Sequence, residues 1–289
     1  MCRTDAVPGL AILAVAIALL WTPAQARPER IVSLNLCSDQ LLLLLAERSR
    51  ISSVTYLASD PQASALADSA AGLPVNHGLA EEILPLNPDL VLAGSFTTRP
   101  TVFLLRELGY PVVELPVASS LDDIRANVRT VAQATGDVER GEALIDDFDR
   151  RLPTRTPEPY AHRPLAALYW ANGFTSGGGT LANAAVEAAG FRTLGGELGL
   201  TGTSQLPLET LLMSDPDVLV VGRQRDEPAL ANETFRHPAL ERAFAGRPRI
   251  GVPDHLWICG TPFVAEAIAR LSALRENAGF GRPGGKKPE

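Results

Sequence analysis

The stretch Glu81-Glu-Ile-Leu-Pro-Leu-Asn-Pro-Asp-Leu-Val-Leu-Ala-Gly94 returns 128 residues further along the chain as Glu209-Thr-Leu-Leu-Met-Ser-Asp-Pro-Asp-Val-Leu-Val-Val-Gly222. The leading glutamate, the Pro-Asp pair and the closing glycine occupy the same positions in both copies. Each copy predicts a short helix that ends before proline and leads into a buried parallel strand. The repeat therefore indicates two lobes of like construction. A chance likeness between two ordinary helix-to-strand corners is the alternative.

Short apolar runs alternate with longer amphipathic stretches from residue 30 onward. Strands are predicted at residues 30–35, 51–57, 89–94 and 111–116, and a second series at 164–170, 217–222 and 249–253. This alternation is typical of α/β folds with mostly parallel sheets. We therefore expect two Rossmann-like α/β lobes, one at residues 27–118 and the other at residues 160–280.

The segment between the two strand series, residues 119–159, is predicted to join the lobes through a single long helix. Residues 120–152 are rich in helix formers and contain no strand-like run. The helix is notched at Gly136, where glycine can end one helical stretch and Asp137 can cap the next. The proline-rich residues 153–159 end it before the second lobe.

The N-terminal residues predict export. Arg3 precedes an apolar run at residues 8–21, and the small residues of Ala24-Gln-Ala26 follow. This is the pattern of a secretory signal peptide (residues 1–26) cleaved near Ala26, and the run is shorter than the ~20 residues that a membrane span needs. A retained membrane anchor is the alternative. Cys2 precedes the apolar run and so does not mark a lipoprotein. The product is expected to be periplasmic, with a disordered tail at 281–289.

Charge and cysteine content exclude some classes of protein. The formal net charge is −7, which argues against a nucleic-acid partner. Beyond residue 26 the cysteines are Cys37 and Cys259. With so few cysteines the fold must rest on a hydrophobic core and not on a disulfide framework.

Residues 30–274 resemble the periplasmic binding proteins of cobalamin and ferric-siderophore ABC importers. The features that carry the resemblance are the opening Arg30-Ile-Val-Ser-Leu, the two Glu-to-Pro-Asp segments, the linker with Gly136, and the C-terminal helix from Thr261. The resemblance implies a ligand cleft between two lobes joined by a long helix, no catalytic chemistry, no cofactor, and transmembrane permease subunits as partners. It also implies that Glu81 and Glu209, one in each lobe, contact arginines of the permease. Asn35-Leu-Cys-Ser-Asp39 departs from the family pattern, which usually has small or hydroxylated residues where the cysteine stands.

Candidate ligand-binding residues come from the loops after the predicted strands, since ligands of open parallel sheets bind beyond the carboxyl ends of the strands. In the first lobe they are Asn35, Cys37, Ser38, Tyr56, Ser95, Phe96 and Arg99, and in the second Trp170, Asn172, Phe174, Arg223, His255, Trp257 and Cys259. The two tryptophans suit stacking on a flat, partly apolar macrocycle. Their alternative place is the core of the second lobe.

Two further groups near these loops have both a binding and a structural interpretation. Arg99, Arg223 and Arg225 can pair with carboxylates of a chelate or lie solvated on the surface. Gly177-Gly-Gly179 precedes a helix and can offer backbone N–H groups to an anion. It lacks the ending of a phosphate-binding loop, so a plain turn is the other interpretation.

The histidines have no paired spacing that would place two metal ligands on one helix face, so a binder of free metal ions is not expected. His77 and His255 lie near the cleft loops. Each suits either an axial position on a chelated metal or an ordinary hydrogen bond. Cys37 follows the first predicted strand and Cys259 the last, which leaves three interpretations: a disulfide, soft ligation of a bound metal, or two unrelated buried thiols.

Together these patterns predict a monomeric solute-binding protein that delivers a metal chelate to an ABC permease, with a corrinoid ahead of a ferric siderophore and haem third. An exported α/β hydrolase is the rival, but it needs a G-x-S-x-G nucleophile elbow, and Ser95 after Gly94 lacks the second glycine. A structural scaffold protein is the third hypothesis. It would have no use for the paired cleft loops.

Overall fold

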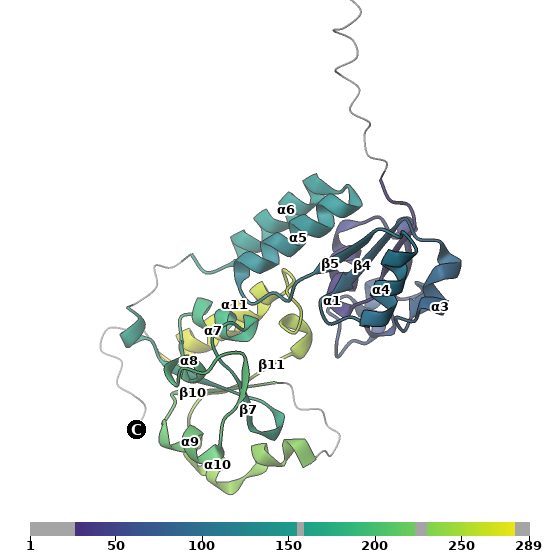
Figure 1. Cartoon of the computed structure of the whole chain (residues 1–289). Helices are drawn as coiled ribbons and strands as arrows, with labels where there is room; N and C mark the ends of the chain where they lie inside the picture. The colour runs from purple at the N-terminus through teal and green to yellow at the C-terminus, as the bar shows by residue number, and fades with distance from the viewer. Residues whose placement is uncertain (1–26, 155–158, 223–229, 281–289) are drawn as a thin grey trace, which may run out of the picture.

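Two α/β lobes flank a pair of helices in the computed structural model, which describes residues 27–154, 159–222 and 230–280 (Figure 1). The first lobe holds a parallel sheet with strand order β3-β2-β1-β4-β5. Its strands are β1 (Ile31–Ser33), β2 (Ile51–Thr55), β3 (Val75–Asn76), β4 (Leu90–Gly94) and β5 (Val112–Leu115). Its helices are α1 (Leu36–Leu45), α2 (Ala67–Ala70), α3 (Ala80–Ile83) and α4 (Arg99–Glu107).

The second lobe repeats this construction with the parallel strand order β11-β10-β6-β8, and adds an antiparallel β7–β9 pair. Its strands are β6 (Leu165–Tyr169), β7 (Phe174–Ser176), β8 (Arg192–Thr193), β9 (Thr203–Gln205), β10 (Val218–Gly222) and β11 (Arg249–Val252). Its α-helices are α7 (Leu181–Ala188), α8 (Leu194–Glu197), α9 (Leu208–Met213), α10 (Pro238–Ala243) and α11 (Val264–Asn277). The 3-10 helices across both lobes are η1 (Arg48–Arg50), η2 (Tyr56–Ser59), η3 (Leu84–Leu86), η4 (Tyr160–His162), η5 (Ala171–Gly173), η6 (Leu230–Arg236) and η7 (Asp254–Leu256).

The predicted α/β class with two lobes and mostly parallel sheets is confirmed. All seven predicted strands are present. Strands β1, β4, β6 and β10 are apolar runs buried along almost their whole length, whereas β5 and β11 are buried only at their last residue. Strands β3, β7, β8 and β9 were not predicted. They have two or three residues each, too few to show an alternating pattern.

The expectation of one long linking helix is wrong. The segment forms two helices, α5 (Leu121–Thr135) and α6 (Val138–Arg151), which lie side by side as a hairpin (Figure 1). Gly136 ends α5 in the left-handed conformation, with φ of 74°, and there the chain reverses. Gly141 permits the close packing of the pair, since a Cβ atom there would lie 2.5 Å from the Cβ of Ala132. Asp137 stands at the N-cap of α6 but its side chain does not cap the helix.

The helical hairpin contacts both lobes. Helix α5 contacts α1 and β5 of the first lobe and α7 of the second, and α6 contacts α11. One hydrophobic cluster accordingly runs from Leu42 through Val128 and Val131 of the hairpin to Val186 and Ile268. No helix in these described ranges is both long and apolar enough to cross a membrane.

The Pro-Asp pair of the sequence repeat has the same structural role in both lobes. Asp89 accepts hydrogen bonds from the backbone N–H groups of Glu29 (3.0 Å) and Arg30 (2.8 Å), at the start of β1. Asp217 accepts one from the backbone N–H of Leu165 (2.8 Å), at the start of β6. Asp89 therefore joins the start of β4 to that of β1, and Asp217 joins the start of β10 to that of β6. This shared role explains why the aspartate stands at the same position in both copies of the repeat.

The residue before each proline of the repeat also matches. Asn87 has φ of 45° and Asp215 has φ of 49°. Asparagine and aspartate are the side chains that best tolerate this left-handed region. The same sharp turn therefore precedes β4 and β10 and sets the direction in which each strand enters its sheet.

Candidate functional site

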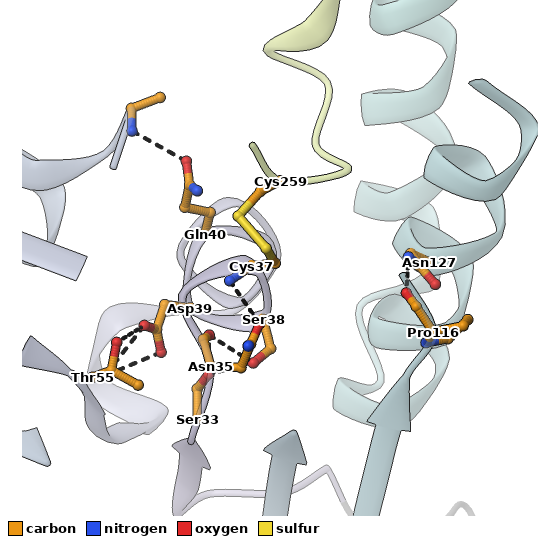
Figure 2. The surroundings of a disulfide bond; sticks show 11 residues. Ser33, Asn35, Cys37, Ser38, Asp39, Gln40, Thr55, Pro116, Asn127 and Cys259 are labelled. Carbon is orange, nitrogen blue, oxygen red and sulfur yellow. Dashed lines mark hydrogen bonds between the residues drawn. A yellow bond between two sulfur atoms is a disulfide. The ribbon is translucent and has the colours of Figure 1, made fainter. Parts of the chain in front are cut away.

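The carboxyl ends of the two parallel sheets face each other. Cys37, just after β1, and Cys259, after β11, form a disulfide between the lobes, with a Cα–Cα distance of 5.1 Å (Figure 2). That distance is ordinary for a disulfide. The two alternatives, soft metal ligation by these thiols and two unrelated buried thiols, do not fit a bonded pair.

Each sheet has its strand order reversed at one point, between β1 and β4 and between β6 and β10. Ligands of open α/β sheets bind at such switch points. At the first, a Cβ on Gly94 would lie 3.0 Å from the side chain of Asn35. At the second, a Cβ on Gly222 would lie 3.1 Å from Oδ1 of Asp254, which follows β11, and 3.4 Å, an ordinary contact distance, from the ring of Trp170. Glycine closes both copies of the repeat because the side chain that follows the neighbouring strand occupies that space.

A pocket of about 60 Å³ lies between the lobes at the first switch point. We call it the inter-lobe pocket. It is lined by Asn35, Cys37, Leu41, Gly94, Leu115, Pro116, Val117, Ala118 and Asn127 on one side and by Ile258 and Gly260 on the other. Ligand sites usually measure 300–1,000 Å³. The inter-lobe pocket by itself is therefore too small to hold a whole ligand of that size.

Asn35 is held in place by the start of α1. Its Oδ1 accepts a hydrogen bond from the backbone N–H of Cys37 (2.9 Å), which caps the helix. Both residues line the inter-lobe pocket. Ser38 does not, because it is buried and its hydroxyl is bonded to Ser33 Oγ (2.8 Å) and to the carbonyl oxygen of Asn35 (2.9 Å). A direct ligand contact by Ser38 does not fit this structure.

The other candidates of the first lobe stand at the ends of β2 and β4. Tyr56 is 54 % exposed and Phe96 is 88 % exposed, so both offer aromatic surface at this edge of the sheet, although neither lines the inter-lobe pocket. Ser95 is partly buried, and its hydroxyl donates to the carbonyl oxygen of Leu115 (3.1 Å). Arg99, the first residue of α4, pairs with Glu114 (2.9 Å) and remains largely exposed.

In the second lobe the two tryptophans differ. Their rings meet edge to face with centroids 5.5 Å apart. Trp257 is only 6 % exposed and belongs to the core, which favours the core alternative for it. Trp170 is half-buried, and its indole N–H donates to Ser176 Oγ (2.9 Å). This anchored ring, beside Gly222, is the one that has surface for a ligand.

The remaining candidates of the second lobe are more dispersed. Asn172 is exposed in the left-handed conformation, with φ of 58°, and Phe174, which begins β7, is half-buried. His255 is half-buried in η7. Arg223 and Arg225 lie outside the described residues.

The Gly177–Gly179 segment is a turn fixed by backbone contacts. The N–H groups of Gly177 and Gly178 donate to the carbonyl oxygens of Gly202 (2.8 Å) and Leu200 (2.9 Å). A Cβ on Gly177 would lie 2.2 Å from that Leu200 oxygen, so only glycine fits. With two N–H groups already bonded, the turn interpretation is favoured over anion binding.

Sequence reasoning missed several residues that line or border the cleft. Pro116–Ala118 follow β5 and Ile258 precedes Cys259, yet none carries a chemical signal that singles it out. Asn127 lies in the linking segment. It reaches the site because its Nδ2 donates to the carbonyl oxygen of Pro116 (3.1 Å), which fixes that loop (Figure 2).

Asp39 is a buried carboxyl group beneath this strand-end edge. It accepts hydrogen bonds from the backbone N–H of Thr55 (3.2 Å) and from the Thr55 hydroxyl (2.5 Å) (Figure 2). Burial raises the pKa of Asp39 to about 6, and the hydrogen bonds from Thr55 and Ser33 only partly offset that rise. The folded protein therefore binds this proton more tightly than the unfolded chain, where an aspartate has a pKa near ~3.9.

Asp39→Asn is expected to remove a pH dependence of stability. Between pH 4 and about 6 the folded state binds more protons at Asp39, so its contribution to the free energy of unfolding falls as the pH rises, by on the order of 2–3 kcal/mol. Asparagine keeps the bonds to Thr55 without the charge, so urea unfolding should show the variant more stable than wild type at pH 7.5 and about equal at pH 4. The exposed Asp68→Asn is the control. Equal gains for both variants would contradict the role given to burial.

Known proteins similar in sequence to this chain are binding proteins. The sequence model of the family described as "Periplasmic binding protein" matches residues 31–248. The chain belongs to the periplasmic binding protein family. A protein of Halobacterium salinarum described as a cobalamin-binding protein is 31 % identical over 262 residues, which is 86 % of this chain and 70 % of the relative.

Solved structures of periplasmic binding proteins share the fold. The heme-binding protein RhuT from Roseiflexus sp. RS-1, in apo form, has a TM-score of 0.70 at 24 % identity, covering 86 % of this chain and 98 % of that one. The vitamin B12-binding protein BtuF of Vibrio cholerae has a TM-score of 0.65 at 20 % identity, covering 88 % and 98 %. Since such different ligands share one architecture, the ligand of this periplasmic binding protein has to be argued from its own side chains.

Proposed function

We propose that this chain is the exported solute-binding component of an ABC importer and that it captures a metal chelate in the cleft between its lobes. A corrinoid is the first candidate ligand, a ferric siderophore the second and haem the third. The observation that carries the proposal is the pair of matched switch points, at Asn35/Gly94 and Trp170/Gly222, one in each lobe, with the inter-lobe pocket at the first of them. The cobalamin-binding relative supports the order of the ligands.

The residues proposed to bind the chelate offer the mixed surface that it needs. Tyr56, Phe96 and Trp170 offer aromatic faces, and Val117 and Ile258 offer exposed aliphatic surface from opposite lobes. Flat macrocycles bind to such surfaces by stacking and by burial of apolar area. The chelate is cargo, and the protein is proposed to act as a monomer that hands it to the transmembrane permease subunits.

The rival hydrolase has no support. The chain belongs to a family of binding proteins, and the nearest approach to a nucleophile elbow, Ser95, has its hydroxyl bonded to a backbone carbonyl. Export through a signal peptide cleaved near Ala26 remains a prediction, since residues 1–26 lie outside the described residues. The tail at 281–289 also lies outside the described residues. The lobe boundaries near residues 118 and 160 likewise stay predictions.

A titration panel tests the proposed function. Purified protein is mixed with cyanocobalamin, a ferric hydroxamate siderophore and haemin, and binding is followed by visible absorption and by quenching of tryptophan fluorescence. We expect saturable binding of one chelate with quenching from Trp170, which is half-buried beside Gly222 at the second switch point. Binding of none of the three would overturn the proposal, and preference for a siderophore or haemin would reorder the ligands.

Glu81 and Glu209 are proposed to contact the permease. Each stands in the first turn of a short helix, α3 or α9, with an exposed side chain. Within residues 27–154, 159–222 and 230–280 no hydrogen bond or ion pair holds either carboxylate. Two such charges, one per lobe, suit orientation of the loaded protein on a two-fold symmetric partner.

The double variant Glu81→Ala with Glu209→Ala is therefore expected to keep its ligand affinity and melting temperature while permease binding and transport fall at least tenfold. A matched control is Glu139→Ala with Glu241→Ala, since these are also exposed glutamates in first helical turns. Binding of the loaded protein to permease-containing vesicles measures docking. If the double variant lost ligand binding instead, the glutamates would belong to the cleft.

A further inference from the structure

His77 stands at the same strand-end edge as the candidate site. It follows β3, and its side chain is 57 % exposed. Its ring stacks on that of Tyr56, which follows β2, with centroids 5.1 Å apart and planes inclined by 24°. Strand β3 lies two strands from β1, a separation of roughly 10 Å. A wide, flat ligand seated over the inter-lobe pocket can therefore extend to this imidazole.

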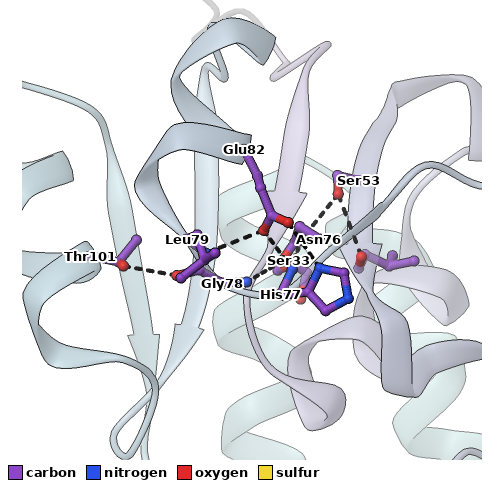
Figure 3. A network of polar contacts seen from close by, with 9 residues as sticks. Ser33, Ser53, Asn76, His77, Gly78, Leu79, Glu82 and Thr101 are labelled. Atoms are coloured by element: carbon purple, nitrogen blue, oxygen red, sulfur yellow. Dashed lines mark hydrogen bonds and ion pairs between the residues drawn. The ribbon is translucent and has the colours of Figure 1, made fainter.

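The ring of His77 is held by a carboxylate. Its Nδ1 lies 2.9 Å from Glu82 Oε1, and its backbone N–H donates to Glu82 Oε2 (2.7 Å) (Figure 3). An ionised carboxylate can only accept, so Nδ1 carries the proton and the lone pair of the neutral ring is at Nε2.

The loop that carries His77 is held by hydrogen bonds to the buried side chain of Asn76. Asn76 is buried, and its Nδ2 donates to the carbonyl oxygen of Ser33 (3.0 Å) and to Ser53 Oγ (2.7 Å), while its Oδ1 accepts from the N–H of Gly78 (3.1 Å) (Figure 3). The Thr101 hydroxyl donates to the Gly78 carbonyl oxygen (2.8 Å). These hydrogen bonds hold the loop that carries the imidazole in one conformation. Ligand binding therefore loses little conformational entropy in this loop.

A purely structural role for the pair explains only part of this arrangement. Glu82 also accepts from the backbone N–H of Leu79 (3.4 Å), so its carboxylate closes the start of α3. That closure uses backbone donors and needs no imidazole. A histidine whose one ring nitrogen donates to a carboxylate while the other is free is the usual arrangement of a metal-ligating histidine.

We propose that Nε2 of His77 is an axial ligand to the metal of a macrocyclic chelate bound in the cleft. This inference rests on the proposed function and narrows its ligand class. The ligand must have an exchangeable axial position, as the cobalt of an aquo-corrinoid and the iron of haemin have. The Nε2 lone pair forms the new metal–nitrogen bond and the axial water leaves, with no change of oxidation state. A siderophore that fills every coordination position of iron offers no such site.

The test compares wild type, His77→Ala and the control His162→Ala, an exposed histidine in η4, in titrations with aquocobalamin, haemin and cyanocobalamin. We expect one of the two chelates, aquocobalamin or haemin, to give the visible bands of an imidazole adduct with wild type and with His162→Ala. The titration shows which of the two it is. His77→Ala should bind that chelate at least tenfold more weakly and without the band shift, and added imidazole should restore the shift. Cyanocobalamin, whose axial positions are occupied, should be bound equally by all three if the cargo is a corrinoid.

Glu82→Gln is expected to keep the fold, since its side-chain oxygen can still accept from the backbone, but to weaken adduct formation by about 10–100-fold. An unshifted spectrum in wild type, a shift that persists in His77→Ala, or binding of a ferric siderophore alone would overturn the axial role and leave the proposed function standing. Binding of no chelate by any variant would overturn both.

Discussion

Asp137→Ala is expected to lower the free energy of unfolding by about 3–5 kcal/mol, because it leaves the Arg50 guanidinium buried without its counter-ion. The side chains of Arg50 and Asp137 are 5 % and 8 % exposed. Arg50 Nη1 lies 2.9 Å from Asp137 Oδ2 and 3.2 Å from Oδ1. Removing one member of such a pair costs far more than removing an exposed one, since no water can replace the lost carboxylate.

The same guanidinium also holds two backbone carbonyls. Its Nε donates to the carbonyl oxygen of Pro28 (2.7 Å), and its Nη2 donates to that of Thr135, at the end of α5. Arg50 therefore ties the N-terminal strand entry and the first lobe to the turn of the helical hairpin. The carboxylate of Asp137 is bonded to Arg50, which explains why it does not cap the N-terminus of α6.

Urea unfolding of Asp137→Ala measures the effect. The control is Asp122→Ala, which removes an exposed partner of Arg125 (2.7 Å) and should change stability by less than about 1 kcal/mol. The double variant Arg50→Met with Asp137→Leu should recover part of the loss, because it removes both charges. A loss below about 1 kcal/mol for Asp137→Ala would show that water reaches the pair.

Most of the fold could be predicted from local patterns. Buried apolar runs predicted β1, β4, β6 and β10, and the repeat predicted that the lobes share one construction. The hairpin could not be predicted as such. Gly136 signals a break, but a break is compatible with a kink or with a reversal. The reversal is selected by contacts between α5 and α6, such as the close packing of Gly141 on Ala132 and the ion pair of Arg129 with Glu142.

The candidate site was predictable as a set of loops but not as a set of side chains. The strand-end rule located Asn35 and Trp170 at the two switch points. It also selected Ser38 and Trp257, which point into the interior, because the direction of a loop side chain depends on what packs above it. The spacing of His77 and Glu82 was the one local signal left unused: a glutamate in a first helical turn can reach back to the residues before it.

Replacing Cys37 and Cys259 together with serine is expected to lower the free energy of unfolding by about 2–5 kcal/mol. The disulfide closes a loop with a sequence separation of 222 residues, and a crosslink over so long a loop restricts the unfolded chain strongly. It also joins the first turn of α1 to the loop before α11. The expected loss therefore includes contacts between the lobes.

The contact beside the disulfide indicates what would move. A Cβ on Gly260 would lie 2.2 Å from the Cβ of Ala118, so the two lobes meet closely at this point. Both residues line the inter-lobe pocket. Without the disulfide the lobes can separate here, and the inter-lobe pocket is then no longer formed before the ligand binds. Part of the free energy of ligand binding would then be spent on closing it, which should weaken affinity as well as stability.

Three samples separate these two effects: oxidised wild type, wild type with reductant, and Cys37→Ser with Cys259→Ser. The last two should agree in urea midpoint and fall below the first, and small-angle scattering should give them a larger radius of gyration in the absence of ligand. Reductant added to the double-serine variant is the control and should change nothing. If all three samples shared one midpoint and one radius, the helical hairpin and its continuous core would suffice to hold the lobes, and the disulfide would not govern the cleft. If stability fell but the radius and the ligand affinity stayed the same, the bond would act on the unfolded chain alone.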